Sequence, residues 1–204
     1  MHQYILDTDY AVHSLIGLIT GEEEQFVRYQ SQHENAKEKE KHLHQQFMDS
    51  QFNDDVVPMQ EQAKYIAWYG THRELAELQR QITLLHMSID FKSASIVALC
   101  GAVLQIAKQG ISIVHSGLSN CPAGRAIGSE YLKNVIWHGR NQSMHYEEGR
   151  FSQAVRDCFS SLEISFGNKF SLDLNTGKNL AHDVIDILGW KDYSIYKADL
   201  RTLL

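Results

Sequence analysis

Proline is the residue that most limits helix formation, and this chain of 204 residues contains only two, Pro58 and Pro122. A proline inside a helix removes a backbone hydrogen bond and collides with the preceding turn. Both prolines fall at apparent segment boundaries, so the long stretches between them are free to be helical. Apolar residues recur there at helical spacing, and no run alternates as a strand would. The sequence therefore predicts an all-α fold, a helical bundle with short connections.

The first half of the chain is expected to form four helices: a short one within residues 1–20, which Asp7, Thr8 or Asp9 could cap, and three over about 22–52, 58–89 and 93–114. Gly21 and Asp90 are expected to separate neighbouring helices, and Asn53-Asp54-Asp55 is expected to form a loop. The second helix is rich in Glu, Gln, Lys and His, which predicts a long polar helix exposed over most of its surface. The fourth is apolar on most sides, so we expect it to be the central helix.

The second half is expected to form helices from a cap at Ser129 to Gly139, over 151–166, and over 180–188, where Gly189 ends the last one. A tail with one further helical turn follows. Length and composition predict a single all-α domain over 1–204, with a core of approximately 59–189 and an N-terminal helical extension over 1–52.

Charge and cysteine usage exclude several classes of protein. The formal net charge of -6 argues against a protein that holds duplex nucleic acid by bulk charge. Residues 120–180, however, hold seven Lys and Arg against six Asp and Glu, a net charge of +1 that is compatible with a local phosphate site. Three widely spaced cysteines predict reduced thiols in a cytoplasmic protein. No apolar run is uninterrupted enough to predict a membrane span.

The stretch from Trp137 to Gly149 concentrates chemically capable side chains between two apolar helical patterns. Arg140 offers a planar fork that matches a phosphate, and His145 can take or give a proton near neutral pH. Asn141 could orient the arginine. Each also has a plainer interpretation: an ion pair of Arg140 with Glu147 or Glu148, a surface histidine, and an asparagine that satisfies loop backbone.

An Arg followed by a His after five or six residues also occurs at Arg28 to His33 and at Arg80 to His86, and composition alone predicts about one such match by chance. Those two pairs lie inside uninterrupted helical patterns, where the partners sit roughly 140° and 120° apart around the axis. Gly139 is expected to end a helix, because glycine takes the left-handed cap conformation without strain. The chain could then turn and bring Arg140 and His145 to one point.

The run Arg140-Asn141-Gln142-Ser143-Met144-His145 resembles the signature of the HEPN superfamily (higher eukaryotes and prokaryotes nucleotide-binding), in which an Arg, often with a following polar residue, precedes a His between helices of a small all-α domain. The resemblance covers this short motif and its helical context. It implies a metal-independent endoribonuclease without a cofactor, in which the ribose 2′-hydroxyl attacks the adjacent phosphorus and leaves a 2′,3′-cyclic phosphate and a 5′-hydroxyl.

Carried onto this chain, the resemblance makes His145 the acid-base residue, Arg140 the catalytic residue that binds the scissile phosphate, and Asn141 a supporting residue. It implies an RNA substrate and a homodimer with a composite site. It also implies a prokaryotic toxin-antitoxin, phage-defence or RNA-processing setting, with an antitoxin or regulatory protein as a further partner. The family's tyrosine modification site is not carried over, because Glu147 stands two residues after the histidine.

Two other classes of function stay open. Some members of the superfamily only bind nucleotides or partners, so the alternative is a noncatalytic helical binding protein that uses the polar helix over 22–52. A metal site at His138, His145 and Glu147, or at His42 and His44, is disfavoured, because neither paired His-x-x-x-His spacing nor a Cys pair is present.

Overall fold

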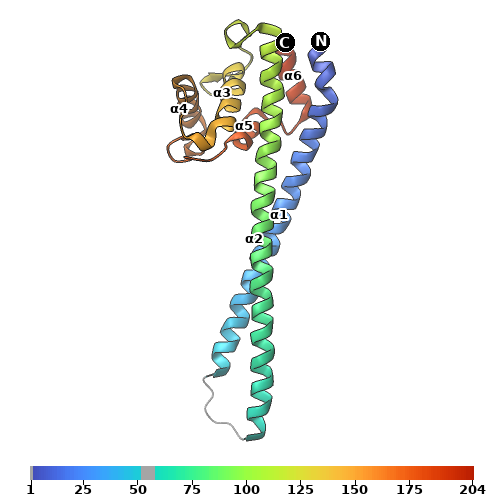
Figure 1. The fold of residues 1–204 in the computed structure, drawn as a ribbon, viewed down its shortest axis with the longest axis vertical. Coiled ribbons are helices and arrows are strands. Elements are labelled where there is room, and N and C mark those ends of the chain that lie inside the picture. Colours follow the sequence, from blue (N-terminus) through green and yellow to red (C-terminus); the bar gives the residue numbers. More distant parts are fainter. Residues whose placement is uncertain (1, 52–57) are drawn as a thin grey trace. The chain divides into compact units, whose positions relative to one another are not determined.

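The computed structural model describes residues 2–51 and 58–204; the side chains of residues 47, 49–51 and 58–67 lie outside that description, as does the loop predicted at Asn53-Asp54-Asp55. Within the described residues the chain forms six α-helices, three short 3-10 helices and one hairpin of two-residue strands (Figure 1). The predicted all-α fold is therefore confirmed. In chain order the elements are α1 (Gln3–Gln51), α2 (Pro58–His115), η1 (Leu118–Asn120), β1 (Ala126–Ile127), β2 (Glu130–Tyr131), α3 (Leu132–His145), η2 (Tyr146–Glu148), α4 (Gln153–Phe166), η3 (Asn168–Phe170), α5 (Ala181–Leu188) and α6 (Tyr193–Leu203).

The chain forms two compact units, and each is described by itself. The first comprises residues 1–22 and 94–204, and the second comprises residues 23–93. Both units contain part of α1 and part of α2. The predicted division into an extension over 1–52 and a core near 59–189 stays a prediction about domain organisation.

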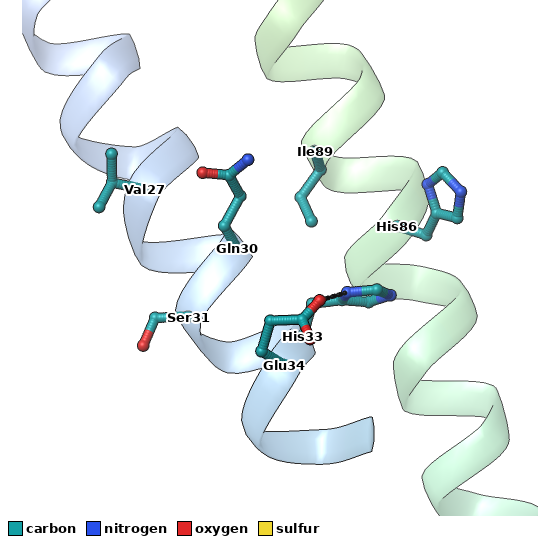
Figure 2. A pocket seen from close by; sticks show the side chains of 7 residues that line it. All are labelled: Val27, Gln30, Ser31, His33, Glu34, His86 and Ile89. Atoms are coloured by element: carbon teal, nitrogen blue, oxygen red, sulfur yellow. Dashed lines mark hydrogen bonds and ion pairs between the residues drawn. The ribbon is translucent and has the colours of Figure 1, made fainter. Parts of the chain in front are cut away.

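The second unit, which we call the arm, is a pair of antiparallel helices. Gln79 Nε2 donates to Glu40 Oε1 at 3.0 Å, and the rings of His33 and His86 lie 5.9 Å apart between their centroids. From the Glu40–Gln79 pair to the His33–His86 pair, α1 runs back by seven residues while α2 runs forward by seven, so the two helices are antiparallel. Figure 2 shows this region, with His33 reaching from α1 towards α2 and bonded to the carboxylate of Glu34 at 3.3 Å.

The two helices of the arm meet along residues spaced alternately by three and four, which is the repeat of a coiled coil. The two helix breaks that we expected are absent, because α1 continues through Gly21 and α2 through Asp90. Asp90 instead lies 3.3 Å from His86 Nδ1, one turn earlier on the same helix. The covered or partly covered residues of the repeat are Phe26, Tyr29, His33, Ala36, Glu40 and Leu43 of α1, and Leu75, Leu78, Ile82, Leu85, Ile89 and Lys92 of α2.

The first unit is built around the C-terminal part of α2, as the sequence predicted for its central helix. In Figure 1, helices α3 to α6 gather at this part of α2. By length and composition alone, α2 over Trp68–His115 could cross a membrane. Within the first unit, the residues Cys100, Val103, Leu104, Ala107 and Ile111 of α2 are fully buried.

The second half of the chain follows the prediction at α4 and α5 and departs from it elsewhere. Ser152 precedes α4, and Gly189 ends α5 in the left-handed conformation, both as expected. Ser129 does not cap a helix, because it follows the hairpin turn at Gly128 and α3 begins only after β2. The tail forms a full helix, α6, where one turn was expected. All three cysteines are described, buried and outside any disulfide, which confirms the predicted thiols.

Candidate functional site

The candidate site lies on the outer side of α3. The inner side of this helix is buried against the rest of the first unit, through Leu132, Val135, Ile136, His138, Gly139, Gln142 and Ser143. Lys133, Trp137, Arg140 and Met144 recur at spacings of four, three and four, so they form one stripe on the outer side, half-buried or exposed. Arg140 is therefore a residue of a helix surface, with its neighbours one turn away on either side.

The predicted helix end at Gly139 is wrong. Gly139 is an interior residue of α3, which runs on to His145 and into η2, and Gly149 takes the left-handed conformation with φ 63° that ends the helical run. A Cβ atom at Gly139 would lie 3.1 Å from Val184 Cγ1 and 3.4 Å from Val184 Cγ2. Glycine at this position therefore allows α3 to approach α5 closely, and the capping role belongs to Gly149.

This correction changes the geometric argument for the Arg140–His145 pair. Both residues lie on one helix, five positions apart, so their side chains leave the axis roughly 140° from each other. That is the same separation as for Arg28 and His33. A helix junction therefore does not distinguish this pair, and a single copy of α3 does not direct both side chains to one point.

The partners of Arg140 distinguish it instead. Its Nε donates to Gln105 Oε1 of α2 at 2.5 Å, and its Nη1 lies 3.4 Å from Asn141 Oδ1. Both acceptors are neutral amides, and within the described residues Arg140 forms no ion pair with a carboxylate. The guanidinium is thus held in place while its charge stays uncompensated, which suits the binding of an anion.

The two glutamates that could have paired with Arg140 have other partners. Glu147 accepts a hydrogen bond from the hydroxyl of Tyr146 at 2.9 Å, and this contact raises the pKa of the phenol. Glu148 Oε1 lies 2.8 Å from His145 Nδ1. The plainer interpretation of Arg140 as one half of a helix-end ion pair is therefore wrong.

His145 ends α3 with its side chain 50% exposed. An ionised carboxylate can only accept a hydrogen bond, so the contact with Glu148 places a proton on Nδ1. In the neutral imidazole this leaves Nε2 as the acceptor, the form that a general base requires. Arg140 is held by Gln105 and Asn141, whereas among the described residues the hydrogen-bond partner of His145 is Glu148, from its own helical run.

The end of α3 is anchored by a polar network that the sequence did not reveal. Gln142 is buried, donates to the Lys178 carbonyl at 2.7 Å and accepts from the Leu180 backbone N–H at 2.9 Å. Asn179 Nδ2 donates to the carbonyl of Ser143 at 3.1 Å. The segment before α5 thus holds the turn of α3 that lies between Arg140 and His145.

The residues of the disfavoured metal site have separate contacts in the structure. His138 is buried on the inner side of α3, and its Nδ1 has no hydrogen-bond partner among the described residues. His145 contacts Glu148, and Glu147 contacts Tyr146. On the arm, His42 and His44 are exposed side chains of α1.

Comparison with known proteins gives no family for this chain. No protein-family model matches it, and neither the curated proteins nor the solved structures contain a match.

Proposed function

We propose that the chain is a metal-independent endoribonuclease of HEPN type, acting on single-stranded RNA. The observation that carries the proposal is the state of Arg140: a half-buried guanidinium, held by Gln105 and Asn141, without a carboxylate partner among the residues that the structure describes. His145 follows at the end of the same helix, with Glu148 on its Nδ1. Arg140 would bind the phosphate and His145 would act as the base, so the proposed reaction needs no metal ion.

In the proposed reaction, Nε2 of His145 takes the proton of a ribose 2′-hydroxyl. The 2′-oxygen bonds to the adjacent phosphorus while the bond from phosphorus to the 5′-oxygen breaks, and the proton passes to that 5′-oxygen. Arg140 stabilises the negative charge that develops on the phosphoryl oxygens. The products are a 2′,3′-cyclic phosphate and a 5′-hydroxyl, so no water or cofactor enters this step.

Because Arg140 and His145 diverge on one helix, the proposal requires two copies of the chain, with Arg140 of one facing His145 of the other. A twofold axis that sets the C-terminal part of one α3, from Arg140 to His145, against the same part of the other would create two equivalent sites. The homodimer is thus part of the proposed function.

The test is cleavage of an unstructured RNA in excess EDTA. His145→Ala and Arg140→Ala are each expected to lower the rate by about 10²–10⁴-fold while circular dichroism stays unchanged, since both side chains lie on the surface of α3. His86→Ala is the control, because His86 belongs to a chance match and is an exposed residue of the arm. Cleavage that persists in both site variants, or products that end in a 3′-hydroxyl, would contradict the proposal.

A second candidate function, noncatalytic partner binding, is favoured by one feature of the arm. Leu84, Met87 and Phe91 are 51%, 51% and 71% exposed. Their spacing of three and four places them on one side of α2, away from the coiled-coil repeat. If wild-type protein cleaves none of a varied set of unstructured RNAs in the same assay, binding through the arm becomes the better proposal.

A further inference from the structure

Helices α2 and α3 run antiparallel along the candidate site, and three pairs of residues define their register. A Cβ atom at Gly101 would lie 3.8 Å from Ser143 Oγ, Gln105 binds Arg140, and Lys108 Nζ lies 4.3 Å from the ring centroid of Trp137. Each step forward along α2 corresponds to a step back along α3. Lys108 therefore follows Gln105 by about one helical turn, or roughly 5 Å along the axis.

Lys108 resembles Arg140 in how it is held. Its ammonium group lies over the face of Trp137, a contact that fixes the side chain without neutralising its charge. Within the described part of the chain, no carboxylate pairs with Lys108. Lys133, on the outer stripe of α3, likewise contacts only neutral acceptors, the carbonyls of Leu118 and Cys121 at 3.3 and 2.8 Å.

The surface formed by Arg140, Lys108, Trp137 and Lys133 thus carries three cations held by amides, a ring and carbonyls. We call it the cationic track. It stands out in a chain whose formal net charge is -6, where bulk attraction cannot concentrate nucleic acid. Cations in a row beside an aromatic side chain are the elements with which proteins hold a single strand of nucleic acid.

We propose that Lys108 is a second phosphate-binding residue, which holds the phosphate next to the one bound by Arg140, and that Trp137 positions it. The inference rests on the proposed function and names its substrate class: a single strand that extends beyond the cleaved bond. An ammonium group recognises a phosphate as a point charge and reads no base. The cationic track therefore positions the RNA strand without giving sequence specificity.

Binding is measured first, in a His145→Ala background that does not cleave. Fluorescence anisotropy with a labelled single-stranded RNA of about ten nucleotides gives Kd over a range of salt concentrations. Lys108→Gln is expected to raise Kd several-fold and to lower the slope of log K against log salt by about 0.7, the value for one phosphate contact on a single strand. Lys169→Gln is the matched control, because Lys169 Nζ lies 5.2 Å from the ring centroid of Phe170.

Kinetics in the wild-type background then separate this inference from the proposed function. Lys108→Gln should raise KM for the longer RNA with little change in kcat, and should leave cleavage of a dinucleotide, which has only the scissile phosphate, unchanged. If Lys108→Gln binds RNA as tightly as Lys169→Gln does while His145→Ala still abolishes cleavage, the inference fails and the proposed function stands. If wild-type protein cleaves nothing but Lys108→Gln alone loses RNA affinity, the cationic track stands and the nuclease proposal fails.

Discussion

At the scale of single residues, His138 shows how burial in the fold sets the protonation state of a side chain. It is 9% exposed, and its buried Nδ1 has no hydrogen-bond partner in the part of the chain that the structure describes. Burial lowers the pKa of the imidazole, and the nearby carboxylates of Glu130 and Asp157 oppose this shift only in part. A protonated His138 would place an unpaired N–H⁺ inside the unit, so the folded state keeps the ring neutral.

This property predicts how stability depends on pH. The unfolded chain binds a proton at His138 as pH falls through about 6.5, while the folded chain resists until a lower pH, so acidification favours unfolding. Urea unfolding at pH 7.5 and 5.5 should show a loss of stability that is smaller in His138→Gln. His42→Gln, at an exposed position of the arm, is the control. An equal pH dependence in wild type and His138→Gln would contradict the argument.

At the level of residues, Arg140, Asn141 and His145 could be predicted as candidates from the sequence, because their side-chain chemistry does not depend on the fold. In the structure Asn141 Oδ1 lies 3.4 Å from Arg140 Nη1, and its supporting role stays a prediction. The sequence could not identify Gln105 and Lys108, which lie more than 25 positions away in a helix that looked merely apolar. Their role follows from the register of α2 against α3, and a Gln or Lys between apolar residues carries no signal of that register.

At the level of elements, the sequence correctly indicated helices but misplaced their ends. Gly21, Asp90 and Gly139 all have properties that disfavour a helix interior, by about 1 kcal/mol for each glycine relative to alanine. Packing over many residues outweighs so small a cost. In the arm, His33 and Glu40 occupy positions of the coiled-coil repeat, and these polar residues hide the repeat from an inspection of apolar spacing.

The close approach of α3 to α5 gives the next prediction. Gly139→Leu should lower the free energy of unfolding by about 1–3 kcal/mol, because the side chain would overlap Val184. Gly139→Ala should stay near wild type, since its gain of about 1 kcal/mol in helix propensity opposes a tight contact. In a Val184→Ala background, Gly139→Ala should become stabilising. Chemical denaturation of the four proteins in this double-mutant cycle measures the coupling between positions 139 and 184. An absence of coupling would contradict the argument that Gly139 allows α3 to approach Val184.

At the level of the whole molecule, one copy of the chain holds the parts of the proposed site but does not assemble them. The outer stripe of α3 presents Arg140, while His145 leaves the same helix roughly 140° away. Pairing of two α3 helices about a twofold axis would bring the Arg140 of each copy towards the His145 of the other. Because each site needs residues from both copies, conditions that dissociate the dimer should also abolish RNA cleavage.

Light scattering at micromolar concentration should therefore give about twice the chain mass of 23.3 kDa.

Mixing two inactive variants tests directly whether the two copies share a site. Arg140→Ala and His145→Ala are each expected to be inactive, but a heterodimer of the two contains one site with an intact Arg140 from one copy and an intact His145 from the other. Equal amounts, after subunit exchange, should recover about a quarter of wild-type activity, because half of the dimers are mixed and half of their sites are complete. A mass of 23.3 kDa at every concentration would remove the composite site altogether. Dimers that exchange subunits without recovering activity would show that Arg140 and His145 do not act across the interface.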